Sequence, residues 1–363
     1  MKKYRAGVIG LGRIGSTFED DPKRVHPCTH AGALAISDTI ELVSGAARSK
    51  ESAERFRTKW GLDRCYTDYE QMIKEEKLDI IAVATNPETH AEIVEKIAPL
   101  GIKGILCEKP IALSLKEADR MIDACKKNNV VLMTMHNRQF NSIYRSAKEI
   151  IKNGDIGVVN SIVGICQGCK PNKNWQSDFE GPLLHDATHL FDIMRYLFGD
   201  VEFVQSAVES AKSGDNIEDS AYSVIRFKNG VYGMTLVNER TDYMRFELEI
   251  QGSKGKLLLF TNEAYMWTYA DSKYSTGFRE LTPMEYPYSN SPLNPYVEAY
   301  KELVECIEKG NLDNNSSTAW DGREALDIIM AIYESQIKDG GKVFLPLPSL
   351  NSTLNIAKEL KAF

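Results

Sequence analysis

The chain has 363 residues, of which 43% are hydrophobic and 26% charged, and its formal net charge is −7. This length favours two globular domains, and the charge balance gives no indication of a nucleic-acid surface or a basic membrane-binding patch. No apolar run approaches the length of a membrane span and the N-terminal segment is unlike a signal peptide, so we expect neither a membrane nor a nucleic acid as a partner.

A glycine-rich turn directly follows the first predicted strand, residues 4–9. Residues 10–15 read Gly-Leu-Gly-Arg-Ile-Gly, the G-x-G-x-x-G pattern of dinucleotide-binding turns. Gly10 permits the tight turn, Gly12 lets the backbone approach a pyrophosphate, and Gly15 allows the helix to pack closely on the strand. A generic glycine turn is the alternative. The predicted cofactor-binding residues of this turn are Gly10, Gly12, Arg13, Ile14 and Gly15.

A polar stretch, residues 16–29, delays the helix that is expected after this turn. It contains His26 and Cys28, and His30 opens the helical pattern that follows. These three side chains resemble metal ligands, but a fourth ligand is missing and Pro27 fixes an extended turn. We therefore predict a loop beside the cofactor phosphates or at the mouth of the cleft, and no metal site.

The second predicted strand, residues 40–46, ends without the acidic residue that binds a ribose 2′-hydroxyl. Ala47, Arg48 and Ser49 occupy that place. A guanidinium and a hydroxyl can bind a 2′-phosphate, and no carboxylate is present to repel it. We therefore predict NADP as the preferred cofactor, with NAD as the second choice. The alternative is that Arg48 stacks on the adenine and does not discriminate between the two.

Two further loops follow predicted buried strands, at the edge where open parallel sheets bind ligands. One follows the strand at residues 78–84, and the other follows the apolar residues 105–107. In the second loop, the Lys109 ammonium would point into the cleft, where it could hold a substrate hydroxyl and help to move its proton. A solvated charged turn before Pro110 is the alternative. The cofactor contacts predicted in these loops are Thr85, Asn86, His90, Glu108 and Lys109.

Strands and helices alternate from residue 4 to residue 135, which predicts an α/β Rossmann domain with a doubly wound parallel sheet. Beyond about residue 140, strands are joined by turn signals such as Asn229-Gly230. This pattern predicts an α+β domain with a large, mostly antiparallel sheet. The predicted boundaries are 1–136 for the dinucleotide-binding domain, 137–347 for the α+β domain and 348–363 for a C-terminal tail.

The chain has seven cysteines, and they are scattered. This distribution fits reduced thiols in the cytoplasm better than a disulfide framework. Cys166 and Cys169 form a C-x-x-C at the end of a predicted strand, where a spacing of three puts the two side chains on opposite faces. No second pair is present, so we do not predict zinc or redox chemistry there.

A second stretch with chemical potential begins at Gly181 and contains His185 and His189. We predict that it opens a helix that runs to Phe198. Residues four apart share a helix face, so the two imidazoles could relay a proton or bind a metal; a buried structural role is the alternative. Upstream, Trp175 could form an apolar wall for a sugar ring, or it could belong to the core.

With these stretches in place, the chain resembles the Gfo/Idh/MocA superfamily, the relatives of glucose–fructose oxidoreductase and inositol 2-dehydrogenase. The resemblance runs from residue 4 to about residue 347. Its markers are the glycine turn at 10–15, Thr85-Asn86-Pro87 with His90, Glu108-Lys109-Pro110, and His189 with Asp192.

The resemblance implies an NAD(P)-dependent oxidoreductase that transfers a hydride between nicotinamide and a secondary alcohol or ketone. The implied substrate is a sugar, polyol, inositol or nucleotide sugar. It also implies that the second domain binds this substrate and has an open-faced sheet through which a homodimer or homotetramer forms. Lys109 and His189 match the family's lysine and histidine, and the bond between Lys109 and Pro110 is expected to be cis.

The chain departs from the family pattern at one position. Many members have an aspartate four residues before the histidine, whereas this chain has His185 there and Asp186 next to it. A neutral imidazole can hydrogen-bond or relay a proton, but it lacks the fixed negative charge that would raise the basicity of a neighbouring base. The predicted catalytic residues are Lys109, His189 and His185. The predicted substrate contacts are Asn137, Arg138, Trp175 and Asp186.

Two other classes of function are weighed against this one. A cofactor-binding regulator without catalysis is disfavoured by the intact Lys109 and His189. An NAD-dependent glycoside hydrolase of the same architecture is disfavoured by the predicted preference for exchangeable NADP. A metallohydrolase built on His185 and His189 is a more distant alternative, which metal analysis would test.

Overall fold

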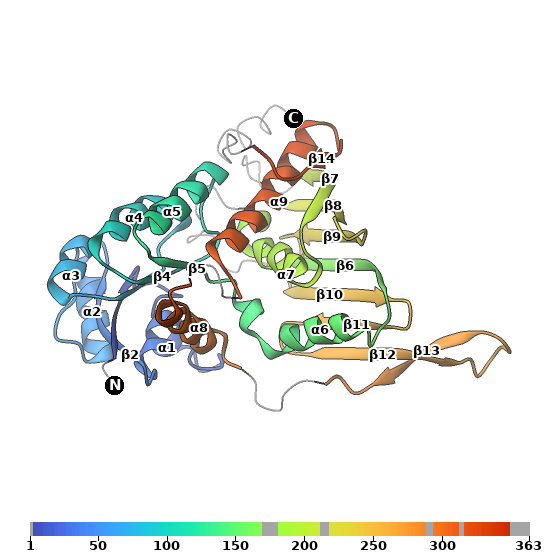
Figure 1. Ribbon diagram of the computed structural model, residues 1–363, viewed down its shortest axis with the longest axis horizontal. Helices are drawn as coiled ribbons and strands as arrows, with labels where there is room; N and C mark the ends of the chain where they lie inside the picture. The colour runs from blue at the N-terminus through green and yellow to red at the C-terminus, as the bar shows by residue number, and fades with distance from the viewer. Residues whose placement is uncertain (1–2, 169–180, 211–217, 288–292, 312–315, 349–363) are drawn as a thin grey trace. The chain divides into compact units, whose positions relative to one another are not determined.

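The computed structural model describes residues 3–168, 181–210, 218–287, 293–311 and 316–348. The predicted tail beyond residue 348, Cys169 and Trp175 lie outside the described residues. The chain divides into two compact units (Figure 1): Met1–Phe140 with Leu293–Arg323, and Asn141–Pro292 with Glu324–Phe363. Within the described ranges, no helix combines the length and the apolar character that crossing a membrane requires.

The first unit contains a five-stranded sheet in the order β2-β1-β3-β4-β5, with every neighbouring pair parallel. Its strands are β1 (Tyr4–Ile9), β2 (Ile40–Ala46), β3 (Ile80–Val83), β4 (Gly104–Cys107) and β5 (Val131–Thr134). Residues 80–83 and 104–107 are buried throughout, as strands covered on both faces require. This arrangement confirms the predicted doubly wound parallel sheet.

Helices cover both faces of the parallel sheet, with α1 and α8 on one side and α4 and α5 on the other (Figure 1). The helices of this unit are α1 (His30–Ala35), α2 (Lys50–Trp60), α3 (Tyr69–Glu76), α4 (His90–Ile97), α5 (Leu115–Lys127) and α8 (Pro295–Lys309). Among the described residues, short 3₁₀ turns accompany them: η1 (Thr17–Asp20), η2 (Pro87–Thr89), η3 (Ala98–Leu100) and η4 (Asn137–Phe140).

Helix α8 comes from late in the chain, yet it packs on the first sheet. Its apolar face, including Tyr300 and Leu303, belongs to the same core cluster as Val8 and Ile80. The approach is close, because a Cβ added at Gly104 would lie 2.9 Å from Leu303 Cδ1. The sequence prediction put this segment in the second domain. Helical periodicity identifies an apolar face, but it does not identify the sheet that the face will cover.

The second unit contains a nine-stranded sheet in the order β13-β12-β11-β10-β6-β9-β8-β7-β14. The β6–β9 pair is parallel and the other described pairs are antiparallel, which confirms the predicted mostly antiparallel sheet. Its strands are β6 (Val159–Gln167), β7 (Val201–Glu209), β8 (Ser220–Phe227), β9 (Tyr232–Asn238), β10 (Arg245–Gly252), β11 (Gly255–Phe260), β12 (Ala264–Asp271), β13 (Arg279–Met284) and β14 (Val343–Phe344).

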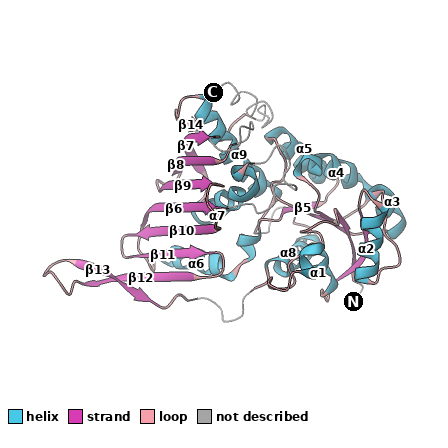
Figure 2. Cartoon of the chain, turned by 180° about the vertical axis from the view of Figure 1, so that it is seen from behind, coloured by secondary structure: helices cyan, strands magenta, loops and turns pink. Residues whose placement is uncertain are grey.

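Helices α6 (Ser142–Asn153), α7 (Thr188–Phe198) and the later part of α9 (Ala319–Ile337) lie along one face of this sheet (Figure 1). Helix α9 belongs to the first unit up to Arg323 and to the second from Glu324. Figure 2 shows the opposite face, on which no helix of the described residues lies. Val224 on β8 and Met234 on β9 point outward there and are 38% and 57% exposed. The sheet is therefore open-faced, as expected.

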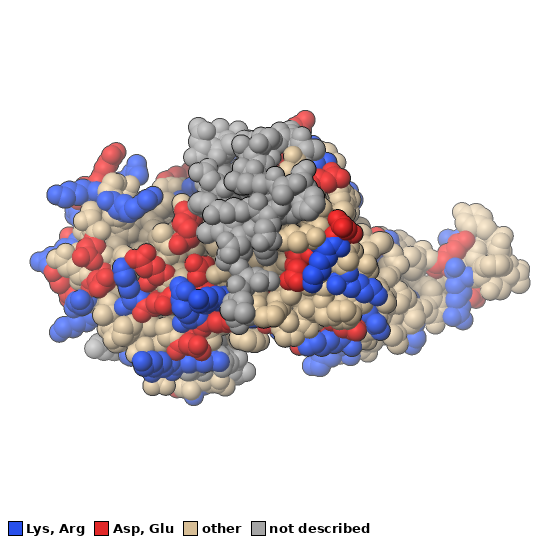
Figure 3. Space-filling model, turned by 90° about the horizontal axis from the view of Figure 1, so that it is seen from above, with Lys and Arg blue, Asp and Glu red and all other residues tan. Residues whose placement is uncertain are grey.

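Strands β12 and β13 form a long hairpin at one edge of the sheet that the sequence analysis did not predict (Figure 1). Every residue of β13 is exposed, so the strand lacks the alternation of buried and exposed positions that identifies strands from sequence. Figure 3 shows basic and acidic side chains intermixed on the face drawn there. At the hairpin's end, Tyr274 and Phe278 are 87% and 70% exposed.

Candidate functional site

A cavity of about 700 Å³ lies in the first unit at the carboxyl ends of β1, β2 and β3. The strand order reverses between β1 and β3, and open α/β sheets bind their ligands at such a point. The volume is within the range of small-molecule and cofactor sites, about 300–1,000 Å³. The predicted cofactor-binding residues that line the cavity are Gly10, Gly12, Arg13, Arg48, Ser49, Thr85 and Asn86.

The glycine turn is tight on one side and open on the other. Gly10 has a φ of +95°, and a Cβ there would lie 2.5 Å from the carbonyl oxygen of Ala84. A Cβ at Gly15 would overlap the carbonyl oxygen of Gly10. At Gly12, by contrast, a Cβ would meet no atom within 4 Å. The turn is therefore pressed against the end of β3, and its backbone at Gly12 is open to a phosphate.

The polar stretch after this turn forms a loop between the turn and helix α1, and hydrogen bonds join the two ends of the loop. The carbonyl oxygens of Ile14 and Gly15 accept hydrogen bonds from the amides of His30 and Ala31, both at 3.1 Å. The loop begins with a 3₁₀ turn whose Thr17 lines the cavity. The predicted contacts Ile14 and Gly15 lie behind the cavity wall, since Ile14 packs against the core and Gly15 is buried.

The part of the cavity beyond β2 contains two arginines, of which the sequence analysis found only Arg48. Ser49 caps helix α2 by accepting a hydrogen bond from the amide of Ser52 at 3.2 Å. One turn further, Arg55 also lines the cavity and donates to the Ser52 hydroxyl at 3.4 Å. Residues 49, 52 and 55 recur at intervals of three, so helical spacing from the predicted cap could have identified Arg55.

Glu108 is a buried anchor beneath Lys109, whose bond to Pro110 is cis as expected. Its carboxylate accepts from His30 Nε2 at 3.1 Å and from the Lys109 backbone amide at 3.2 Å. The other ring nitrogen of His30 lies 2.8 Å from the Tyr300 hydroxyl, which can donate to it. Burial alone would raise the pKa of Glu108, but the His30 hydrogen bond and the Lys109 charge bring it below its usual value. An ionised Glu108 therefore orients the backbone that carries Lys109, and it does not line the cavity.

His90 is fully buried and joins the two loops that carry predicted site residues. Its ring nitrogens lie 3.0 Å from the carbonyl oxygen of Pro110 and 3.1 Å from that of Thr85. Burial lowers the pKa of His90, which keeps the ring neutral. The structure therefore places His90 behind the cavity, where it ties the loop after β3 to the loop after β4.

In the second unit, a π-helical turn at Leu183–Ala187 precedes α7 and contains His185. His185 Nδ1 lies 2.7 Å from the carboxylate of Asp186, and both side chains are partly buried. The prediction that His185 and His189 share a helix face assumed regular α-helical winding. A π-turn holds more residues per turn, so the four-residue rule does not apply across it.

The predicted substrate contacts Asn137 and Arg138 lie in η4, directly after the end of β5. The Asn137 side-chain oxygen is buried, and it has no hydrogen-bond partner among the described residues. A buried acceptor of this kind is suited to a ligand donor, because leaving it without a partner costs free energy.

The family comparisons agree with both units. A model of the Gfo/Idh/MocA oxidoreductase family, described as an NAD-binding Rossmann fold, matches residues 4–136, and the model of the family's C-terminal domain matches residues 144–258. The chain belongs to the Gfo/Idh/MocA oxidoreductase family. For this family member, the turn and cavity described above fit the dinucleotide that its first domain binds.

Similar proteins extend this Gfo/Idh/MocA assignment over most of the chain. The chain is 30% identical over 331 residues to a myo-inositol 2-dehydrogenase of Thermotoga maritima, covering 89% of this chain and 93% of the relative. It is 26% identical to a levoglucosan dehydrogenase of Pseudarthrobacter phenanthrenivorans, covering 93% and 97%. The solved structure of a probable dehydrogenase from Thermotoga maritima superposes with a TM-score of 0.75 at 26% identity, covering 94% and 98%.

Proposed function

We propose that this chain transfers a hydride between a nicotinamide cofactor and a secondary alcohol or ketone of a sugar, polyol, inositol or nucleotide sugar. The observation that carries the proposal is the glycine turn, which is open at Gly12 toward a cavity of about 700 Å³ at the switch point of the sheet. The relatives named for inositol and levoglucosan oxidation support a polyhydroxylated substrate and argue against a silent regulator or a hydrolase.

The protein's own part in this reaction is to hold the reacting oxygen and to move its proton. When bound, nicotinamide would accept the hydride from the alcohol carbon or return it to the ketone carbon. We propose that Lys109 and His189 hold the reacting oxygen and that one of them takes or gives its proton. Both residues match the family's lysine and histidine. Asn137 and Arg138 are assigned to substrate hydroxyls on the strength of their position after β5.

His185 and Asp186 act as a pair in this proposal. Asp186 lies 2.7 Å from His185 Nδ1 and can accept a hydrogen bond from it, which would orient the ring. Many members of the family have an aspartate four residues before the histidine. In this chain Asp186, one residue after that position, would supply the negative charge through the imidazole of His185. Asp186 was predicted to contact the substrate directly; we now assign that contact to His185 and orientation of the ring to Asp186.

The preferred cofactor in this proposal is NADP(H). Arg48 and Arg55 line the same cavity as the hydroxyls of Ser49 and Ser52, which together could bind a 2′-phosphate. Two carboxylates, Glu88 and Glu92, also line the cavity. Glu92 pairs with Lys96 at 2.6 Å, and Glu88 accepts a hydrogen bond from the Asn86 side-chain amide at 3.4 Å.

Arg48→Ala should weaken NADPH binding by about 10- to 100-fold, since a hydrogen bond to a charged group contributes about 1.5–3 kcal/mol. NADH binding should change much less. Fluorescence titration of both reduced cofactors measures this. Arg57→Ala is the matched control, because Arg57 lies on the same helix and pairs with Glu54 at 2.7 Å. Tighter binding of NADH than of NADPH by the unmodified protein would end the NADP assignment.

A substrate screen tests the function itself. Polyols, inositols, aldoses and nucleotide sugars are incubated with NAD⁺ or NADP⁺, and reduction is followed by the absorbance of the reduced nicotinamide. We expect turnover with at least one member of these classes. Tight cofactor binding without turnover on any of them would favour the regulator, and purification with NAD already bound would favour the hydrolase.

A second copy of this chain is the partner that we propose for the open face of the large sheet. Outward-facing apolar residues lie on five strands, at Val163, Val224, Met234, Leu258 and Tyr265, with Glu249 of β10 between Val163 and Leu258. Charged residues on β10 and β11 interrupt this surface, and they pair within the chain: Arg245 with Glu247 at 2.6 Å and Lys256 with Glu249 at 3.6 Å. Such a surface suits a two-fold interface in a homodimer or homotetramer.

Met234→Glu should dissociate this assembly, because burying an unpaired carboxylate costs about 3–5 kcal/mol. Sedimentation velocity would show a smaller particle than the unmodified protein. Lys152→Glu is the control, since Lys152 is exposed on α6, on the helical side of the sheet. A monomeric unmodified protein, or an unchanged mass after Met234→Glu, would contradict the interface.

We also propose a cytoplasmic location, which the six cysteines without a disulfide among the described residues support.

A further inference from the structure

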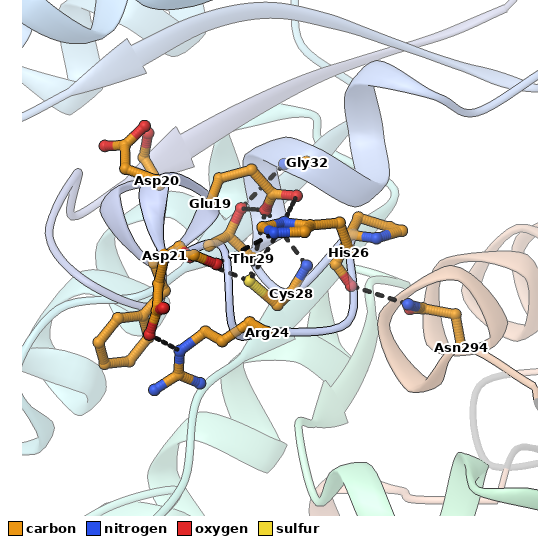
Figure 4. Close-up of polar contacts among 12 residues, drawn as sticks. Glu19, Asp20, Asp21, Arg24, His26, Cys28, Thr29, Gly32 and Asn294 are labelled. Carbon is orange, nitrogen blue, oxygen red and sulfur yellow. Dashed lines mark hydrogen bonds and ion pairs between the residues drawn. The ribbon is translucent and has the colours of Figure 1, made fainter.

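The looped-out segment between Gly15 and His30 gathers three side chains of the kinds that bind transition metals (Figure 4). Glu19 Oε1 lies 3.0 Å from His26 Nδ1, and Cys28 Sγ lies 3.8 Å from both His26 Nδ1 and Glu19 Oε2. The set differs from the trio noted in the sequence. His30 points instead to Glu108 and Tyr300, and Glu19 takes its place.

The spacing of these atoms suits a tetrahedral ion. Zinc bonds are about 2.3 Å to sulfur and about 2.0–2.2 Å to nitrogen and oxygen, so neighbouring ligand atoms around zinc lie about 3.3–3.6 Å apart. The observed separations of 3.0 and 3.8 Å bracket this range. Small shifts of the three side chains would therefore bring them to bonding distance of one ion.

The surroundings of the His26 ring also point to a cation. Nε2 lies 3.1 Å from the backbone oxygen of Asp21, and Nδ1 lies 3.0 Å from the carboxylate of Glu19. When Nε2–H donates to the Asp21 oxygen, Nδ1 is the ring atom that faces Glu19 and can bind an ion. A backbone carbonyl on the second ring nitrogen is the usual support of a metal-bound histidine.

The other contacts hold the candidate ligands in place. Glu19 Oε2 accepts from the Thr29 hydroxyl at 2.6 Å and from the Cys28 amide at 3.2 Å, which orients Oε1 toward His26. Asn294 on the same unit donates to the Pro27 carbonyl oxygen at 2.7 Å and fixes the loop between the histidine and the cysteine. The Cys28 side chain is buried, whereas His26 is 40% exposed, so solvent can reach the fourth position.

We propose that Glu19, His26 and Cys28 bind one Zn²⁺ ion, with water as the fourth ligand. The sulfur, imidazole and carboxylate set favours zinc over magnesium or calcium, which take oxygen ligands. The ion stabilises the loop that starts at the cofactor cavity and ends at the N-terminus of α1. Burial and the Glu19 carboxylate raise the pKa of Cys28 to about 11, so the ion has to displace the thiol proton when it binds.

Cobalt binding tests the site in the full-length protein. After chelation and dialysis, the unmodified chain should bind one equivalent of Co²⁺ with a thiolate-to-metal absorption band and the visible bands of tetrahedral cobalt, and Zn²⁺ should displace it. Cys28→Ser should abolish the thiolate band and weaken Zn²⁺ binding by more than about 100-fold, because even supporting residues of metal sites contribute about 10- to 100-fold. Cys65→Ser and Cys169→Ser are the matched controls and should bind as the unmodified protein does.

A second variant keeps the test independent of folding. His26→Gln removes one ligand and leaves the Cys28 thiol in place. Circular dichroism establishes that each variant is folded. Added Zn²⁺ should raise the melting temperature of the unmodified protein and leave that of His26→Gln unchanged. Absence of bound Co²⁺, or a cobalt spectrum that survives Cys28→Ser, would overturn the site. In that case hydrogen bonds alone hold Glu19, His26 and Cys28 together.

Discussion

Replacing Lys109 by alanine should lower kcat for the alcohol substrate by about 10²- to 10⁴-fold, the usual contribution of a positioned proton-transfer group. NADPH affinity should persist, because the cavity residues of the glycine turn and of α2 are untouched. The physical reason lies in the local geometry. Ionised Glu108 accepts hydrogen bonds from the Lys109 backbone amide and from His30. These bonds hold the backbone at the end of β4 in place when the Lys109 side chain is removed. Steady-state kinetics with a substrate from the screen, together with fluorescence titration of NADPH, measure the two quantities separately.

The control for this variant is Lys103→Ala at the other end of the same strand. Lys103 is exposed and pairs with Asp79 at 2.8 Å, so its loss should leave kcat unchanged. Lys109→Arg keeps the positive charge but cannot give up a proton near neutral pH, and it should stay as slow as the alanine variant. Turnover by Lys109→Ala at the rate of the unmodified protein would remove this residue from the mechanism. Full activity of Lys109→Arg would mean that Lys109 contributes only its positive charge and does not transfer a proton.

Local patterns predicted much of the fold because they depend on neighbours in the chain. The strand at residues 40–46 has the predicted bounds. The glycine turn was recognisable because its constraints lie within six residues and the strand before it. The partner of α8 was not predictable in this way, since an apolar helix face does not specify which of two sheets it meets.

The candidate site shows the same limit at the level of single side chains. His26, Cys28 and His30 are close in sequence, but the structure separates them, because His30 begins helix α1 and its side chain contacts buried Glu108. Glu19 joins the other two from seven residues upstream, a distance for which no short metal-binding motif exists. The position of His185 relative to His189 likewise depends on a π-turn that residue spacing does not reveal.

The glycine turn carries the second large effect that we expect. Gly12→Ala should weaken NADPH binding by about 5- to 150-fold without lowering stability. Its new methyl group meets no protein atom within 4 Å and projects instead from the backbone that lines the cavity. Overpacking of this kind against a ligand phosphate costs about 1–3 kcal/mol, which converts to that change in affinity. NADPH titration and thermal unfolding of the same samples measure the two effects.

Gly10→Ala should weaken both binding and stability, because Gly10 has a φ of +95° and its Cβ would lie 2.5 Å from the Ala84 carbonyl oxygen. Gly101→Ala separates these causes. Gly101 also has a positive φ, +85°, but nothing lies within 4 Å of its Cβ, so this variant should lose stability and keep its NADPH affinity. If Gly12→Ala bound NADPH as tightly as the unmodified protein, the phosphates would have to lie away from this turn. The cavity at the end of β1 would then not be the cofactor site, and the assignments of Arg48 and Arg55 would fail with it.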